Sequence, residues 1–219
     1  KECWTVNASA VEDISGVCAE RDIHLVHVST DFVFNGADGP YRENDSPDPV
    51  NYYGEAKLAG ERSIQDSNVG RWTIARTVLV YGTAEKLGRS NIALWIIDEL
   101  LNDREVQIVT DQWRTPTYVH DLAHGIQQII DRSAEGIYHL SGPELLSVHD
   151  FAKRIASIYG FDESLVQPIT SEALGQTARR PPRTGFIIER AKDELGFQPH
   201  SIDEALKDLA TALDLPTTV

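Results

Sequence analysis

Short runs of strand character alternate with helical patterns along most of this 219-residue chain. Strands are predicted at residues 24–28, 73–81, 106–109 and 136–140. Helices are predicted at residues 4–20, 53–66, 91–101 and 122–130, with two further helices beginning near Ser147 and Ser201. Strands that alternate with helices favour a parallel sheet with right-handed crossovers. The sequence therefore predicts an α/β protein, and the mostly helical stretch after Ser141 predicts a smaller second lobe.

The overall charge limits the kinds of partner that this chain can bind. The formal net charge is −14, and no cluster of lysine and arginine offsets it locally. A nucleic-acid partner demands a basic face, so we expect none. An anionic small ligand stays open, because a few arginines and helix N-termini can bind phosphates locally.

Cysteine usage and apolar content suggest the compartment. Neither Cys3 nor Cys18 lies in a CxxC or Cys/His spacing, so we expect reduced thiols and no metal site. No apolar run approaches the ~18 residues that span a bilayer, and the first residues lack a signal-peptide layout. We expect a cytoplasmic protein with no membrane partner. The chain has no methionine and opens within a helical pattern, so we also expect further residues before Lys1.

Tyr53 and Lys57 are four residues apart in a predicted helix and share one of its faces. An ammonium beside a phenol favours the phenolate, so we expect the pKa of Tyr53 to move down towards neutrality. Such a tyrosine can serve as a general acid or base. With seven tyrosines in the chain, a YxxxK pattern also arises by chance, and a solvated surface pair is the alternative.

Thr30 lies at the end of the strand predicted at 24–28. Ligands of open α/β sheets bind beyond the carboxyl ends of the strands, where a hydroxyl can meet a substrate oxygen. A long loop at 35–50 separates Thr30 from Tyr53, and long loops inside compact domains tend to be functional. The alternative is that Ser29 and Thr30 merely end a strand.

A longer motif surrounds these residues. Residues 27–61, HVSTDFVFNGADGPYRENDSPDPVNYYGEAKLAGE, resemble the active-site segment of dTDP-4-dehydrorhamnose reductases, within the extended short-chain dehydrogenases/reductases. The similarity continues in RTVLVYG (76–82), DQWRTPTYVHDLA (111–123), GIYHLSG (136–142) and RRPPRTGFIIERAKDELGF (179–197). It therefore covers essentially the whole chain, in order.

The resemblance implies a catalytic set of Thr30, Tyr53 and Lys57. In that family, NADPH or NADH delivers hydride to a sugar 4-keto carbon. Tyr53 would then protonate the developing alkoxide, Thr30 would hydrogen-bond the same oxygen, and Lys57 would hold the nicotinamide ribose. Thr77 and Tyr81 are further candidate neighbours of the nicotinamide.

Three other residues are candidates for binding a nucleotide-sugar substrate. Asn91 resembles the family's asparagine that meets the sugar-nucleotide phosphates, and Arg114 and Arg180 are candidate phosphate or nucleotide clamps. For each arginine, an ordinary surface or ion-paired residue is the alternative.

The resemblance also implies a doubly wound, Rossmann-type parallel sheet with a mostly helical substrate lobe. The implied parts are the end of the cofactor domain at 1–83, a substrate-lobe insertion at 84–117, a return to the sheet at 118–142 and the substrate-binding lobe at 143–219. The family's glycine-rich GxxGxxG turn, which seats the cofactor pyrophosphate, has no counterpart in this sequence. We therefore expect the N-terminal strands to be missing. Leu25–Val28 should pair in parallel with Ile74–Tyr81 and leave a vacant edge, or one covered by a segment before Lys1.

Two other functions stay open. The regulatory beta subunit of methionine adenosyltransferase resembles the same motifs, so a non-catalytic, NAD(P)-binding subunit is the main alternative. A sugar-nucleotide epimerase or dehydratase is the second alternative. A homodimer is also left open.

Overall fold

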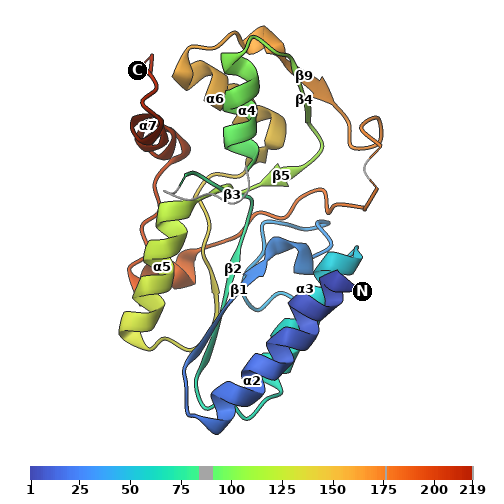
Figure 1. Ribbon diagram of the computed structural model, residues 1–219, viewed down its shortest axis with the longest axis vertical. Coiled ribbons are helices and arrows are strands. Elements are labelled where there is room, and N and C mark those ends of the chain that lie inside the picture. The colour runs from blue at the N-terminus through green and yellow to red at the C-terminus, as the bar shows by residue number, and fades with distance from the viewer. Residues whose placement is uncertain (84–90, 176, 219) are drawn as a thin grey trace.

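The computed structural model describes residues 1–83, 91–175 and 177–218 (Figure 1). Its central parallel sheet has the order β1-β2-β7. The three strands are β1 (Leu25–Thr30), β2 (Trp72–Thr77) and β7 (Gly136–His139). Leu25 lies opposite Trp72 and Thr30 opposite Thr77, which confirms the expected parallel pairing of the first two strands. Within the described residues β1 is an edge strand, as expected, and its Val28 is 41% exposed.

Helices cover both faces of this sheet (Figure 1). One face carries α1 (Glu2–Trp4), a π-helical turn (Thr5–Ser9), α2 (Ala10–Glu20) and α3 (Tyr52–Gln65), and the other carries α5 (Val119–Arg132). Ile74 of β2 packs in one cluster with Val11 and Ile64, whereas the next residue, Ala75, packs in another cluster with Ile129. Strands that bury both faces in this way are typical of a parallel sheet between helices. The predicted Rossmann-type layering is confirmed.

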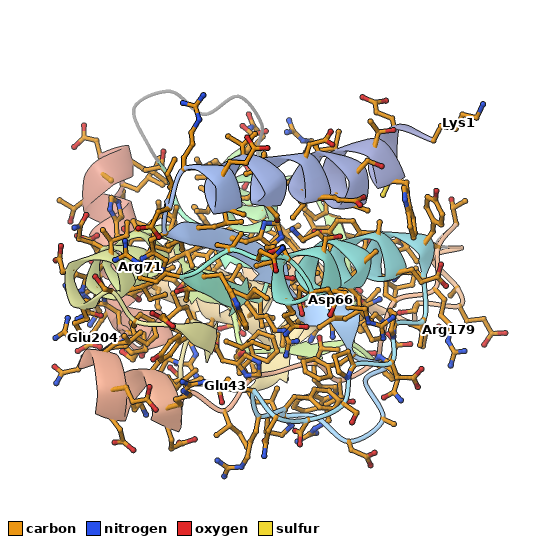
Figure 2. The ribbon with its side chains drawn as sticks, turned by 90° about the horizontal axis from the view of Figure 1, so that it is seen from below. Lys1, Glu43, Asp66, Arg71, Arg179 and Glu204 are labelled. Carbon is orange, nitrogen blue, oxygen red and sulfur yellow. The ribbon has the colours of Figure 1, made fainter. Side chains whose placement is uncertain are left out.

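The helices of the first face pack closely together, and Figure 2 shows α2 and α3 side by side. A Cβ atom on Gly60 would lie 2.4 Å from the Asn7 carbonyl oxygen, so only glycine fits at this point of α3. The close approach fixes α3, which carries Tyr53, against the helix that precedes β1.

A second lobe lies beyond the carboxyl end of the sheet (Figure 1). Its elements are α4 (Ile92–Leu101), β4 (Val106–Val109), β5 (Trp113–Arg114), β8 (Leu146–Ser147), α6 (Val148–Tyr159), a 3-10 turn (Glu163–Leu165), β9 (Val166–Ile169) and α7 (Ile202–Leu213). The strands form two small pairs, parallel β4-β9 and antiparallel β5-β8. Ile96, Phe151 and Leu206 belong to the shared core of its three helices. Ser201 and Glu204 form the predicted capping box of α7.

The prediction of one continuous strand at 73–81 is wrong after Thr77. β2 ends at Thr77, and Leu79 adopts φ +39°, a conformation that is uncommon for residues other than glycine. The chain then forms β3 (Val80–Tyr81), which pairs in parallel with β6 (Thr117–Tyr118). The Thr117 hydroxyl donates to the Val78 carbonyl at 2.7 Å and thereby holds the break. A contact with a segment about forty residues away directs the chain from the sheet into the second lobe.

The division into four segments at 83, 117 and 142 stays a prediction. In the described ranges, none of the helices has both the length and the apolar character that a membrane crossing needs.

Candidate active site

Thr30 is the last residue of β1, at the carboxyl edge of the sheet. A single 3-10 turn, Asp31–Val33, follows directly. The Thr30 hydroxyl caps this turn by accepting from the Phe32 N–H at 3.3 Å, and it donates to Asp31 Oδ1 at 3.1 Å. The side chain is buried but lies at the place where open α/β sheets bind their ligands.

Tyr53 reaches Thr30 because the first turn of α3 packs directly on the 3-10 turn. Asn51 caps α3 by accepting from the Gly54 N–H at 2.9 Å. A Cβ atom on Gly54 would lie only 2.2 Å from the Phe32 carbonyl oxygen, so glycine permits the approach. The Phe32 and Tyr53 rings meet edge to face, with centroids 5.9 Å apart. Tyr53 is 40% exposed and lies against the turn that directly follows Thr30, so the structure brings these two predicted residues together.

The pKa of Tyr53 is raised above its ordinary value of 10, not lowered as expected. Burial is the main cause, and the negative charges of Asp31 and Cys3 act in the same direction, whereas the hydrogen bond with Thr30 lowers the pKa. A raised pKa keeps the phenol protonated near neutrality. The expectation was wrong because burial and the charge of Asp31 raise the pKa of Tyr53, while the Lys57 ammonium is engaged with the Val28 carbonyl and His27.

Lys57 is buried and directed at β1. Its Nζ donates to the Val28 carbonyl at 2.7 Å and lies 3.1 Å from His27 Nε2. Burial lowers the pKa of Lys57, although Glu61 opposes this change. Burial and the Lys57 charge together lower the pKa of His27 to about 4, so the ring is neutral near pH 7 and can accept from the ammonium.

A cavity of about 300 Å³ lies between the two lobes, beside Asp31 and Phe32. Its apolar lining residues include Leu79, Ile92, Trp95, Val109, Val148 and Leu174. Its polar lining residues include Asp31, Gln112, Arg114 and Arg180. A mostly apolar pocket with a few convergent polar groups is typical of small-molecule sites.

Arg114 is buried, and its guanidinium interacts with other groups of the protein. Its Nε lies 3.5 Å from Asp31 Oδ2, and its other nitrogens donate to the carbonyls of Trp113, Pro181 and Pro182. Burial lowers its pKa, and the charge of Asp31 opposes this change. The structure therefore shows the ion-paired arginine that was the alternative, and the role of phosphate clamp stays a prediction.

Arg180 is exposed at the rim of the same cavity. The segment that carries it is fixed on both sides, because Asn51 donates to the Arg179 carbonyl at 2.8 Å and Arg114 donates to the Pro181 carbonyl at 2.8 Å. Figure 2 shows Arg179 at the end of the molecule where Lys1 also lies. This segment of the second lobe is thus hydrogen-bonded to Asn51, the residue that caps the helix carrying Tyr53.

The other predicted residues lie deeper or elsewhere. Asn91 caps α4, and its Nδ2 donates to the Gly82 carbonyl at 2.7 Å. Thr77 ends β2 next to Thr30 and donates to the Thr117 hydroxyl at 3.1 Å. Tyr81 is buried in the core of the second lobe, where burial raises its pKa. The structure does not bring Tyr81 to Tyr53, and the ligand roles of all three residues stay predictions.

Sequence reasoning missed Asp31 and Thr184 as parts of the site. The Thr184 hydroxyl donates to Asp31 Oδ2, and both side chains are buried. Asp31 could have been noticed, because a carboxylate directly after the apolar strand is unusual and follows Thr30 in the motif. Thr184 lies far away in the sequence, and no local pattern points to it.

A parallel α/β sheet with Thr30 at a strand end, next to a helix bearing Tyr53 and Lys57, defines a short-chain dehydrogenase/reductase. The model of the family described as RmlD substrate binding domain matches residues 1–215, and the chain belongs to this family.

Known proteins agree with this assignment. The chain is 31% identical over 212 residues to a probable low-salt glycan biosynthesis reductase of Haloferax volcanii. The aligned part covers 94% of this chain and 69% of that protein. It is 35% identical over 179 residues to methionine adenosyltransferase 2 subunit beta of Xenopus laevis, covering 80% of the chain and 53% of that protein. The crystal structure of dTDP-4-dehydrorhamnose reductase from Bacillus anthracis in complex with NADP superposes with a TM-score of 0.85 at 31% identity, covering 94% of this chain and 72% of that one. The chain thus spans between about half and three quarters of the length of these relatives.

Proposed function

We propose that the protein reduces the 4-keto group of a nucleotide-linked 4-keto-6-deoxy sugar, with NADPH or NADH as reductant and Tyr53 as proton donor. The observation that carries this proposal is the packing of the first turn of α3, which bears Tyr53, on the turn that follows Thr30 at the carboxyl edge of β1, beside the 300 Å³ cavity. The similarity to an NADP-bound dTDP-4-dehydrorhamnose reductase supports it.

The chemistry follows from the protonation state of Tyr53. The raised pKa keeps the phenol protonated near neutrality, so it can protonate an alkoxide that develops on the sugar. Thr30 lies next to it and positions the same oxygen. The exposed part of Tyr53 leaves room for the substrate to approach.

The residues present fit the nicotinamide end of a dinucleotide. Tyr53 and Lys57 lie one helical turn apart, and Thr77 lies in register with Thr30 at the same edge of the sheet. Tyr53, Lys57 and Thr77 would hold the nicotinamide and its ribose, whereas Thr30 faces the substrate oxygen. When bound, this group supplies the hydride. The ammonium of Lys57 is anchored by the Val28 carbonyl, which limits its freedom to leave the site.

The cavity suits a ligand that combines apolar surface with anionic groups. The ring of Trp95 is 40% exposed there and offers a surface on which a base or sugar can stack. Arg180 at the rim is available to a diphosphate. Asn91 and Arg114 remain candidate ligands of the same substrate. The cytoplasmic location and the homodimer stay predictions.

A regulatory role is the second candidate, because the chain is also 35% identical to the beta subunit of a methionine adenosyltransferase. Such a subunit could keep Tyr53 and Lys57 without turning over a sugar. Consumption of NADPH in the presence of a 4-keto sugar nucleotide favours the enzyme, whereas co-purification with a synthetase and no turnover favours the subunit.

The Tyr53→Phe variant tests the proposal directly. We expect turnover to fall by about 10²–10⁴-fold while cofactor affinity stays nearly unchanged, because only the donated proton is lost. The rate is measured as NADPH consumption with dTDP-4-keto-6-deoxyglucose or its epimerised product. Tyr52→Phe is the matched control, since Tyr52 is the neighbouring exposed tyrosine and contacts Trp4. Near wild-type turnover of Tyr53→Phe would remove Tyr53 from the mechanism.

A further inference from the structure

His27 of β1 is the side-chain partner of Lys57. Its ring is partly buried, and Nε2 lies 3.1 Å from Lys57 Nζ. The register partner of His27 on β2 is Ile74, which packs with Val11 and Ile64 beneath α2 and α3. His27 therefore presents a ring nitrogen to Lys57 beside an apolar part of the interface between β1 and α3.

The protonation states of the two groups decide which of them donates. An ammonium carries three hydrogens and no lone pair, so His27 Nε2 has to accept from it. Burial lowers the pKa of Lys57, whereas Glu61 of the same helix opposes this change and favours the ammonium. Burial and the Lys57 charge hold the pKa of His27 at about 4, so its ring is neutral near pH 7. A neutral ring that accepts at Nε2 carries its hydrogen on Nδ1.

Two acceptors on β1 restrict the ammonium more than one acceptor would. Lys57 donates to the Val28 carbonyl at 2.7 Å, and this bond alone would leave the ammonium free to turn about its axis. A second hydrogen bond, to His27, removes that rotation. Because the nitrogen is tetrahedral, the third hydrogen then has one fixed direction.

We propose that His27 is a positioning residue that, together with the Val28 carbonyl, fixes the Lys57 ammonium and leaves its third hydrogen for the cofactor ribose. The inference rests on the proposed function, because it takes Lys57 as the residue that holds the nicotinamide ribose. A group that is already fixed before its ligand arrives loses less freedom on binding, so His27 should strengthen cofactor binding through Lys57.

The tautomer of His27 tests the inference on the unaltered protein without any cofactor. Long-range 1H–15N NMR at pH 7 on protein with labelled histidines shows which ring nitrogen carries the hydrogen, and His27→Gln identifies the signal. We expect the hydrogen on Nδ1. A hydrogen on Nε2 would overturn the proposal, because that nitrogen could not then accept from Lys57.

The Lys57→Met variant tests the same contact through the ionisation of His27. Removal of the ammonium should raise the pKa of His27 above about 4, and the value should stay below 6.5 because burial is the larger cause. The same labelled histidine signal reports the titration. An unchanged pKa would show that the ammonium does not lie beside the ring, and the proposal would fail.

A pair of substitutions separates the hydrogen bond from the shape of the side chain. His27→Leu removes the acceptor, and we expect KM for NADPH to rise by about tenfold while kcat at saturating NADPH falls less. His27→Gln supplies an amide oxygen as acceptor and should restore most of the lost affinity. Equal KM values in the two variants would overturn the proposal. The two NMR experiments need no turnover, so a lack of reductase activity in the unaltered protein would reject the proposed function alone, whereas an Nε2–H tautomer rejects only the role of His27.

Discussion

Two buried arginine–carboxylate pairs serve two regions of this molecule in different ways. Inside the first lobe, Arg76 of β2 meets Glu61 of α3 through two hydrogen bonds of 3.0 and 2.7 Å, and their side chains are 2% and 1% exposed. At the junction of the lobes, Arg114 and Asp31 approach only to 3.5 Å, and both have other partners. In the first pair, Arg76 and Glu61 hydrogen-bond each other twice. In the second pair, Asp31 and Arg114 divide their hydrogen bonds among several neighbouring groups.

The difference shows how a buried charge can be either structural or functional. The bidentate pair engages both oxygens of Glu61 and fixes α3 on the sheet. The Asp31 carboxylate instead distributes its capacity over Thr30, Thr184 and Arg114, which join the strand end, the segment at 181–184 and β5. Loss of the first pair should therefore cost stability, and loss of a partner at the second should also change the chemistry.

The largest effect on stability is expected for Glu61→Gln. The change leaves the Arg76 charge buried without its partner, and removing one member of such a pair costs about 3–5 kcal/mol of unfolding free energy. Urea denaturation measures the loss. Glu55→Gln, an exposed change on the same helix, is the control and should stay within about 0.5 kcal/mol. A loss below about 1 kcal/mol for Glu61→Gln would show that the two pairs do not differ as described.

A smaller loss is expected for Thr184→Val, which removes one donor from the Asp31 carboxylate and keeps the shape of the side chain. Hydrogen bonds to charged groups contribute about 1.5–3 kcal/mol to stability. Because Thr184 belongs to the segment near Arg180, KM for the sugar nucleotide should rise, whereas the pKa of Tyr53 should not change. Thr184→Ser keeps the hydroxyl and should restore both stability and KM. If Thr184→Ser is as defective as Thr184→Val, the hydroxyl is not what links the segment to Asp31.

The residues of the candidate site differ in how well the sequence predicted their positions. Tyr53 and Thr30 could be paired in advance, because a strand end and a helix N-terminus are local patterns and the motif between them is long. The direction of Lys57 could not be foreseen, since its hydrogen bond to the Val28 carbonyl depends on how α3 lies on β1. For the same reason, the expected fall in the pKa of Tyr53 was wrong.

The sequence predicted the path of the chain into the second lobe less well. The run at 73–81 has uniform strand character, and nothing in it marks the turn at Leu79. That turn depends on Thr117. This residue lies in β6, a strand of only two residues that has no periodicity of its own. Tyr81 was expected near the nicotinamide, but the turn directs its side chain into the core of the second lobe. Long-range pairings of this kind leave no local trace in a sequence.

The pH dependence of kcat tests most directly whether Tyr53 acts as a protonated donor. A general acid must carry its proton, so turnover is retained below its pKa and lost as the pH rises through that value. Because burial and the charge of Asp31 raise the pKa of Tyr53 above 10, we predict that the basic limb of kcat lies above pH 10. The residual activity of Tyr53→Phe should lack this limb. A basic limb well below pH 10 that persists unchanged in Tyr53→Phe would contradict the account, because another group would then supply the proton.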